Sequence, residues 1–274
     1  MKSAISDRDS TGAQRGEISR SPHCPSKRQT AAEKRRGCSK KGKEEGHGME
    51  ACETIRQRKS IRAFKPDPVP RGTLKEIMEL ALRAPSWANT QPWEFAIATG
   101  KTLEEIREAF VDNAEEQANP DIPHPRGFPE PYDTRRRVLG REVFELKGIS
   151  REDKERRKWW LLQGLRLFEA PCAIYIYIDR SFYLQGHALN VWPIFDCGLV
   201  AENIMLLAPT YGLGTIAQIQ AVGYPDILRS ILRITDSKLI VLGIAIGYPD
   251  WDDPINQLHS EREPLDSIST WYGF

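Results

Sequence analysis

The chain has 274 residues, of which 40% are hydrophobic, so it is long enough for one or two domains with a sizeable core. Its net charge of +1 combines a basic segment, with twelve basic and six acidic side chains in residues 1–48, and an acidic remainder, with 27 basic and 32 acidic ones. A mildly acidic main part argues against a general nucleic-acid-binding surface.

Residues 1–48 contain no Phe, Trp or Tyr and are rich in Ser, Gly, Lys, Arg and Glu. Such a segment cannot bury enough apolar surface to offset the entropy of ordering, so we expect it to be disordered. Three interpretations remain open: a basic tail that binds nucleic acid or another polyanion, a segment without a role, or translation that begins at Met49. We favour the last two, and therefore do not expect nucleic acid as a partner.

Cysteine usage and hydropathy bear on the compartment. None of the five cysteines forms a C-x-x-C pair, and Cys172 and Cys197 stand among apolar residues as core thiols do. The first residues contain no apolar run typical of a secretory signal, and the longest apolar runs, residues 173–178 and 239–246, are far too short to span a membrane. We expect a cytoplasmic protein that does not insert into a membrane. The five histidines lack ligand spacing, so we expect no metal site.

The first third of the folded part contains helices around a single strand. In chain order, we expect a short helix at residues 52–58, a helix from Thr73, a strand at 93–99 and a helix from Thr102. Each threonine opens a capping box, because Glu76 and Glu105 follow it by three residues.

Residues 113–168 form a long charged excursion, which we interpret as a lid or binding loop. The excursion consists of a proline-rich run and two helices, expected at residues 113–135, 135–146 and 151–168. Ser150 is the expected cap of the second helix. Trp159 and Trp160 on that helix are either core residues, which we favour, or an aromatic wall over a substrate pocket.

The last third contains the remaining strands. We expect a strand at 172–178, a buried central helix at 194–207, a strand after Gly214, a helix from Pro225 to about Arg233 and an interior strand at 239–246. There is no repeated βαβ unit and no glycine-rich dinucleotide motif. This order favours a three-layer α+β sandwich over a Rossmann domain.

The loop Pro85–Trp93, with the sequence Pro-Ser-Trp-Ala-Asn-Thr-Gln-Pro-Trp, is the most informative stretch. Its polar side chains offer donors and acceptors without charge, which suits the edge of a planar heteroaromatic ring. Taken alone, it would be an ordinary polar loop between two prolines. Two further segments accompany it: Arg-Lys-Ser-Ile-Arg at residues 58–62 and His-Ser-Glu-Arg-Glu-Pro-Leu at 259–265.

In this order, the three segments resemble the FMN-dependent nitroreductase family, from about Cys52 to Phe274. The resemblance implies a nitroreductase-like, FMN-binding domain at residues 49–274, with a central mixed, mainly antiparallel sheet flanked by helices. It also implies a homodimer in which residues 251–274 wrap the other subunit. This segment is rich in large apolar residues that need a surface to cover.

The resemblance also implies which residues bind FMN. Arg58, Ser60 and Arg262 match the phosphate ligands, with Lys59 and Ser260 beside them, and Arg62 matches the cation near flavin N1 and O2. The polar loop matches positions that reach the flavin, partly from the opposite subunit: Pro85, Ser86, Asn89 and Gln91. A backbone segment behind the flavin ring is expected at Ile216, Ala217 and Gln218.

The implied activity is electron transfer from NAD(P)H through FMN to a small electron-poor acceptor, such as a nitroaromatic or a quinone, by a ping-pong mechanism. Such a site needs few acid–base residues because the cofactor carries the chemistry. Trp87 is bulkier than its counterpart in some members, and Ser260 stands where many have Lys. Two alternatives remain: a specialised relative, such as a reductive dehalogenase, a flavin-fragmenting enzyme or an azoline-forming oxidase, and a non-enzymatic flavin-binding regulator with a nucleic-acid-binding tail.

Overall fold

A four-stranded sheet forms the centre of the computed structural model, which describes residues 51–186 and 188–274. Its strands are β1 (Glu94–Thr99), β2 (Cys172–Asp179), β6 (Lys238–Gly247) and β5 (Gly214–Gln218), in that spatial order. All neighbours are antiparallel, and a parallel bridge joins Ser60 to Thr215 at the β5 edge. The apolar β6 is interior, as predicted. The segment 1–48, expected to be disordered, lies outside the described residues.

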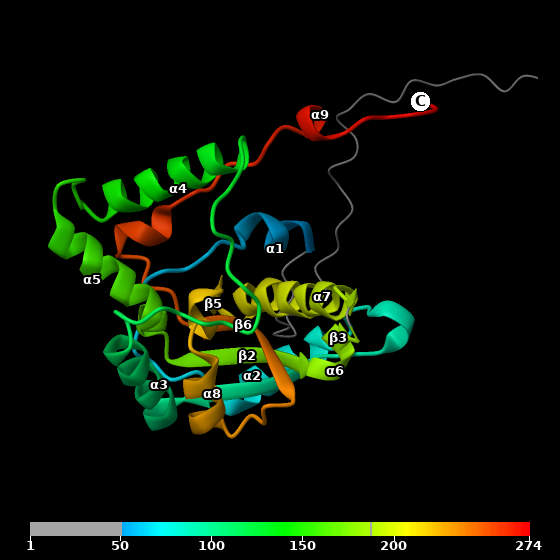
Figure 1. The fold of residues 1–274 in the computed structure, drawn as a ribbon. Helices are drawn as coiled ribbons and strands as arrows, with labels where there is room; N and C mark the ends of the chain where they lie inside the picture. Colours follow the sequence, from blue (N-terminus) through cyan, green and yellow to red (C-terminus); the bar gives the residue numbers. More distant parts are fainter. Residues whose placement is uncertain (1–50, 187) are drawn as a thin grey trace, which may run out of the picture. The chain divides into compact units, whose positions relative to one another are not determined.

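Helices cover both faces of the sheet, as a three-layer α+β sandwich requires. Alternate side chains of β2 face opposite layers: Ile174 and Ile176 join the core beneath α2 (Arg71–Ala81) and α7 (Trp192–Leu207). The side chain of Tyr175 lies in the other core cluster. Figure 1 shows α7 and α8 on opposite sides of the sheet.

The remaining elements frame these layers. The second core cluster is built on α3 (Gly100–Asp112), α5 (Lys154–Leu165) and α8 (Pro225–Leu232). The other helices are α1 (Ala51–Gln57), α4 (Tyr132–Leu146), α6 (Arg180–Tyr183) and α9 (Leu265–Ile268), and β3 (Leu184–Gln185) pairs with β4 (Ala188–Leu189). Short 3₁₀ helices are η1 (Trp87–Asn89), η2 (Leu167–Glu169), η3 (Ala208–Tyr211), η4 (Gln220–Val222) and η5 (Pro254–Gln257).

The predicted capping boxes are wrong, because both helices begin two residues earlier. Pro70, with φ −59°, directly precedes α2, and Thr73 lies inside its first turn. Gly100 has φ +54°, so the chain turns from β1 straight into α3, and Thr102 is again inside the helix.

The cap assigned to Ser150 is also wrong. The side chain of Asp153 caps α5 by accepting from the backbone N–H of Arg156 at 2.9 Å. Ser150 accepts a hydrogen bond from the N–H of Asp153, so it stabilises the turn before the helix. The aspartate lies nearer the free N–H groups and takes the capping role.

Helix α7 is less buried than its apolar sequence suggested. The side chains of Val200 and Ile204 are fully buried against the sheet, whereas Trp192 and Phe195 are 52% and 58% exposed. The sheet covers only one side of a helix, so an apolar residue on the other side needs a different partner. This exposed stripe adjoins the polar loop at the start of the helix.

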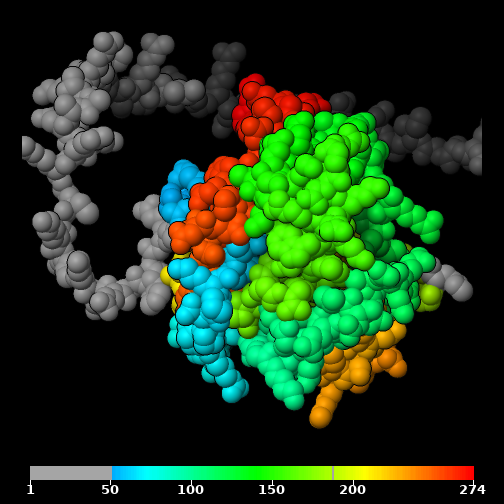
Figure 2. Space-filling view, turned by 90° about the vertical axis from the view of Figure 1, so that its left-hand side faces the viewer, coloured from blue at the N-terminus to red at the C-terminus, as the bar shows by residue number. Residues whose placement is uncertain are grey.

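The excursion is anchored to the body at a buried carboxylate. Asp121 accepts from the backbone N–H of Ile240 and from the guanidinium groups of Arg180 and Arg229. Helix α4 buries only Val143. Figure 2 shows the green surface of the excursion beside the orange-red segment that precedes the C-terminus.

The two tryptophans of α5 differ in burial. Trp160 belongs to the core, as favoured, whereas Trp159 is 45% exposed. The ammonium group of Lys147 lies 5.9 Å and 5.5 Å from their ring centroids, and it pairs with Asp253 at 2.8 Å. Lys147 thus ties the excursion to η5.

The C-terminal segment runs away from the sheet as an irregular tail that carries α9, drawn in red in Figure 1. Its large apolar side chains are exposed: Leu265, Ile268, Trp271, Tyr272 and Phe274. Within residues 51–186 and 188–274, none of the helices has the length and apolar composition needed to cross a membrane.

Candidate active site

The first of two cationic segments, residues 58–62, follows α1 and runs along the edge of β5. The helix ends at Gln57, and the chain continues extended, with the N–H of Ile61 donating to the carbonyl oxygen of Thr215 at 3.0 Å. Ser60 forms the parallel bridge to the same residue. The segment is therefore fixed by the sheet edge, and its side chains are carried at defined positions.

The first cationic segment meets a second one, residues 259–262, at one cavity of about 400 Å³, although the two are far apart in the sequence. Among the residues that line this cavity are Arg58, Lys59, Glu202, Ser260 and Arg262. The guanidinium group of Arg262 donates to Ser260 Oγ at 2.9 Å and to the carbonyl oxygens of residues 260 and 261 at 3.0 Å each. Arg58 lies 3.8 Å from the Glu202 carboxylate.

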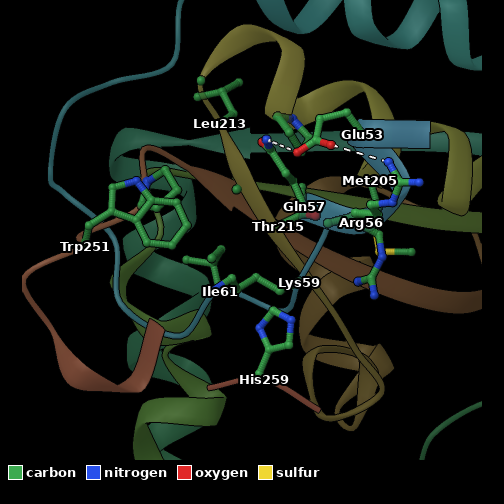
Figure 3. Close-up of a pocket in the computed structure, with 15 residues that line it drawn as sticks. Glu53, Arg56, Gln57, Lys59, Ile61, Met205, Leu213, Thr215, Trp251 and His259 are labelled. Atoms are coloured by element: carbon green, nitrogen blue, oxygen red, sulfur yellow. Dashed lines mark hydrogen bonds and ion pairs between the residues drawn. The ribbon is translucent and has the colours of Figure 1, made fainter. Parts of the chain in front are cut away.

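An adjoining cavity of about 500 Å³ opens beside the first (Figure 3). Lys59 and His259 line both cavities. The Lys59 ammonium group donates to the carbonyl oxygen of Asn256 at 2.9 Å and lies 5.3 Å from the centroid of the Trp251 ring. Thr215 contributes the wall formed by β5.

Arg62 is a partly buried cation of the same segment. Its guanidinium group donates to the carbonyl oxygen of Ser60 at 3.2 Å, and no carboxylate of the described residues lies within ion-pair distance. Burial lowers the pKa of Arg62 from its ordinary value. A cation held without a carboxylate can pair with an anionic ligand, and the low dielectric around it strengthens that interaction.

The polar loop, residues 85–93, lies beside the first turns of α7 and not at these cavities. The buried carboxylate of Asp196 accepts from the N–H of Trp87 with both oxygens at 3.2 Å. Ser86 Oγ accepts from the N–H of Gln91 at 3.0 Å, and the Gln91 amide donates to Asn89 Oδ1. These contacts hold a loop in which Ala88, Asn89 and Gln91 have positive φ. Residues 85–93 line neither cavity described above.

The predicted backbone segment on β5 is buried except at Ala217. Ile216 and Gln218 are buried, and the Gln218 amide donates to the carbonyl oxygen of Gly164 at 3.1 Å. Ala217 is exposed and shares its face of the strand with Thr215. Only Ala217 and the backbone of this segment are therefore free to meet a ligand.

Several lining residues had no signal in the sequence. Glu202 sits inside an apolar helix, and Met205 and Trp251 stand in no motif. His259 belongs to the predicted segment 259–265, but no role was assigned to it. Their roles depend on contacts across the fold. In the described ranges, no group of three His, Cys, Asp or Glu side chains could hold a metal ion.

The donor set fits a phosphate monoester. Three arginines, a lysine and the serine hydroxyl of residue 260 line one cavity. Arg56 and Arg58 have carboxylate partners, whereas Lys59 and Arg262 have none within ion-pair distance among the described residues. Guanidinium groups and hydroxyls form short, charge-assisted hydrogen bonds to phosphate oxygens. The adjoining cavity offers apolar walls for a larger body attached to that phosphate.

The chain has relatives of known activity. The model of the nitroreductase family matches residues 55–248. The chain is 31% identical, over 228 residues, to a 4-nitrobenzoate reductase of Nocardioides sp. (strain LMS-CY), a match that covers 79% of this chain and 87% of that protein.

Solved structures share the fold. The FMN and NADPH-dependent nitroreductase NfnB from Sphigopyxis sp. strain HMH superposes with a TM-score of 0.77 at 31% identity, covering 82% of this chain and 100% of that chain. The FMN-dependent nitroreductase NfnB from Mycobacterium smegmatis, in complex with NADPH, superposes with a TM-score of 0.75 at 27% identity and covers 82% and 99%. Because these matches span most of the chain, the protein belongs to the nitroreductase family.

Proposed function

We propose that the protein is an FMN-dependent oxidoreductase that takes electrons from NAD(P)H and reduces a small electron-poor acceptor, such as a nitroaromatic or a quinone. The convergence of Arg58, Lys59, Ser260 and Arg262 on one cavity carries the proposal, because this cluster suits a single terminal phosphate. The family and its FMN- and NADPH-dependent members support it.

The residues divide into two tasks. Arg58 and Arg262, which line the cavity, hold the phosphate with Ser60, and the partly buried guanidinium group of Arg62 stabilises negative charge on the pyrimidine side of the flavin. Ser60 and Arg62 belong to the same segment as Arg58 but line neither cavity themselves. Bound FMN would supply the two-electron chemistry, so the chain needs groups that bind and orient rather than acid–base catalysts. The apolar walls of the adjoining cavity exclude water from the flavin.

We further propose a homodimer in which the polar loop of one chain completes the flavin site of the other. The loop lies away from the cations of its own chain, and beside it α7 exposes Trp192 and Phe195. The apolar tail from Trp251 to Phe274 supplies a second exposed surface of the same kind. Large exposed apolar patches mark association sites. We also propose that the protein is cytoplasmic and that its other partners are small molecules.

Flavin titration tests the cofactor. Flavin-free protein is titrated with FMN, FAD and riboflavin, and quenching of flavin fluorescence gives each affinity. We expect FMN to bind best. Arg262→Met should weaken FMN binding about tenfold or more while leaving riboflavin binding unchanged, because a hydrogen bond to a charged group contributes about 1.5–3 kcal/mol. Arg141→Met, which removes an exposed arginine of α4, is the matched control. Preference for FAD, or no flavin binding, would refute the proposal.

Turnover tests the reaction. Anaerobic NADH or NADPH should bleach the bound flavin, and stopped-flow reoxidation is then followed with nitroaromatics, quinones, halophenols and enones. Parallel double-reciprocal plots are expected for a ping-pong mechanism. Fast reoxidation by halophenols alone would favour a dehalogenase, whereas a flavin that neither nicotinamide bleaches would favour a non-enzymatic binding protein.

Subunit mixing tests the shared site. A chain with Arg58→Ala and Arg262→Ala is mixed with a chain carrying Asn89→Ala, and the subunits are allowed to exchange. Each heterodimer should recover one intact FMN site. A wild type that sediments as a flavin-loaded monomer, or a mixture that stays as empty as its parents after confirmed exchange, would contradict the proposal.

A further inference from the structure

Asn256 is a fully buried polar residue that lies between the two cationic segments. Its side chain has no solvent exposure, although η5 itself is a short surface turn. It comes four residues before Ser260 and six before Arg262. Buried amides are retained where their hydrogen bonds are made, so the partners of Asn256 show what the residue does.

The side chain of Asn256 is bonded to the first cationic segment. Its Oδ1 atom accepts from the backbone N–H of Arg62 at 2.8 Å, and Nδ2 donates to the carbonyl oxygens of Ala63 and Asp250 at 2.8 Å each. Both amide hydrogens and one oxygen lone pair are therefore used. The amide acts like one rung of a β-ladder, because it binds backbone groups of two adjacent residues, the N–H of Arg62 and the carbonyl oxygen of Ala63.

These bonds extend a pairing that the backbone makes only in part. The N–H of Asp250 donates to the carbonyl oxygen of Ala63, and the N–H of Lys65 donates to that of Tyr248. This pairing between backbone groups does not reach Arg62. There the Asn256 side chain accepts from the backbone N–H instead. The backbone bonds thus hold residues 63–65 against residues 248–250, and the amide of Asn256 extends this connection to Arg62.

The backbone of Asn256 acts on the same segment. Its carbonyl oxygen accepts from the Lys59 ammonium group at 2.9 Å, which aims this cation along the cavity shown in Figure 3. Its N–H donates to the carbonyl oxygen of Asp253 at 3.1 Å. One residue therefore contacts Lys59, Arg62 and the turn that leads to Ser260 and Arg262.

We propose that Asn256 is a positioning residue that sets the spacing between the two halves of the phosphate site. The proposal rests on the proposed function, because it assumes that the cations bind the phosphate of FMN. Asn256 itself does not touch the ligand. Its larger effect falls on the phosphate contacts, since Lys59, Ser260 and Arg262 line the phosphate cavity. Its bond to Arg62 adds a smaller effect on contacts of the flavin ring.

The ratio of FMN affinity to riboflavin affinity separates this role from a general structural one. Riboflavin lacks the phosphate, so its affinity reports the ring and ribityl contacts alone. The variants are Asn256→Ala, which removes all three bonds, and Asn256→Asp, which keeps the shape and the oxygen acceptor but lacks both donor hydrogens. Asn203→Ala is the control, because Asn203 likewise donates from a part-buried amide to a distant carbonyl oxygen, that of Ala81.

Flavin-free samples of each variant are titrated with both ligands, and thermal unfolding is recorded in parallel. We expect both Asn256 variants to lose about tenfold or more in FMN affinity and about threefold or less in riboflavin affinity, so that the ratio of the two affinities falls. Asn203→Ala should lower the unfolding temperature without changing the affinity ratio. An unchanged ratio in the Asn256 variants, or failure of both to fold, would overturn the proposal. If wild-type protein binds no FMN, the proposed function fails instead.

Discussion

Asp121 holds the excursion on the body of the fold, and its replacement by Asn should destabilise the protein strongly. The carboxylate is 8% exposed and accepts from Arg229 at 2.5 Å, Arg180 at 2.8 Å and the N–H of Ile240 at 2.8 Å. The side chain of Arg229 is itself only 10% exposed. Asp121→Asn keeps the shape and one acceptor, but it leaves a buried guanidinium group without its closest counter-charge.

The magnitude follows from the burial of the pair. Removing one partner of a buried ion pair costs about 3–5 kcal/mol, and the retained acceptor reduces this to about 2–3 kcal/mol. For a domain of this size, 1 kcal/mol shifts the unfolding temperature by roughly 2–4 °C, so we expect Asp121→Asn to unfold roughly 5–10 °C below wild type at pH 7.

The dependence on pH gives a second signature. Burial raises the pKa of Asp121, but the Ile240 N–H and the two guanidinium groups outweigh it and hold the pKa below its ordinary value. The stabilisation is therefore fully present above the pKa of the unfolded chain and is lost as the pH falls through the lower folded value. The difference between wild type and variant should shrink below about pH 4.

Calorimetry of both proteins from pH 7 to pH 3 measures these effects. Glu115→Gln is the matched control, because it removes an exposed ion pair to Lys158 that lies within the excursion, and its unfolding temperature should match wild type. An Asp121→Asn protein that unfolds within about 2 °C of wild type at pH 7 would refute the reasoning. So would a stability difference that stays constant down to pH 3.

Three further predictions concern packing and thiols. Gly214→Ala would place a Cβ atom 2.4 Å from the side chain of Ile61, so we expect weaker FMN binding in fluorescence titrations and a loss of about 1–3 kcal/mol in denaturant unfolding. Tyr175→Phe removes a buried hydroxyl that has no hydrogen-bond partner among the described residues, so its unfolding temperature should equal or exceed that of wild type in scanning calorimetry. Burial raises the pKa of Cys172 and Cys197 to about 12, so mass spectrometry should find both unlabelled by a thiol reagent at pH 8 until the protein is unfolded.

The sheet could be predicted from the sequence because its interior strands bury both faces. The apolar runs at 172–178 and 239–246 lie within β2 and β6, and each strand extends those limits by only one residue at one or both ends. A strand that packs against helices on both sides has no polar face, so its composition alone identifies it. The predicted starts of two helices were wrong because backbone geometry at Pro70 and Gly100 outweighed the capping motifs.

The site was predictable only in part, because a motif gives residue types and not their distances. Arg58 and Arg262 do meet at one cavity. Asn256 could not be assigned, since its bond to Arg62 joins residues 194 positions apart and an isolated Asn has no distinctive pattern. The exposed side of α7 at Phe195 was missed for a related reason, because hydrophobicity does not say which face the sheet covers.

The charge distribution decides how such a site can attract its ligand. Residues 49–274 carry more acidic than basic side chains, so the domain as a whole repels an anion. At physiological ionic strength, charges beyond about 8 Å are screened, and this repulsion is weak at the cavity. Affinity for a phosphate must then come from contacts at hydrogen-bond distance, whose strength depends on exact placement. This makes the spacing of the two cationic segments, rather than the number of cations, the quantity that controls binding, and Asn256 is the buried link between them.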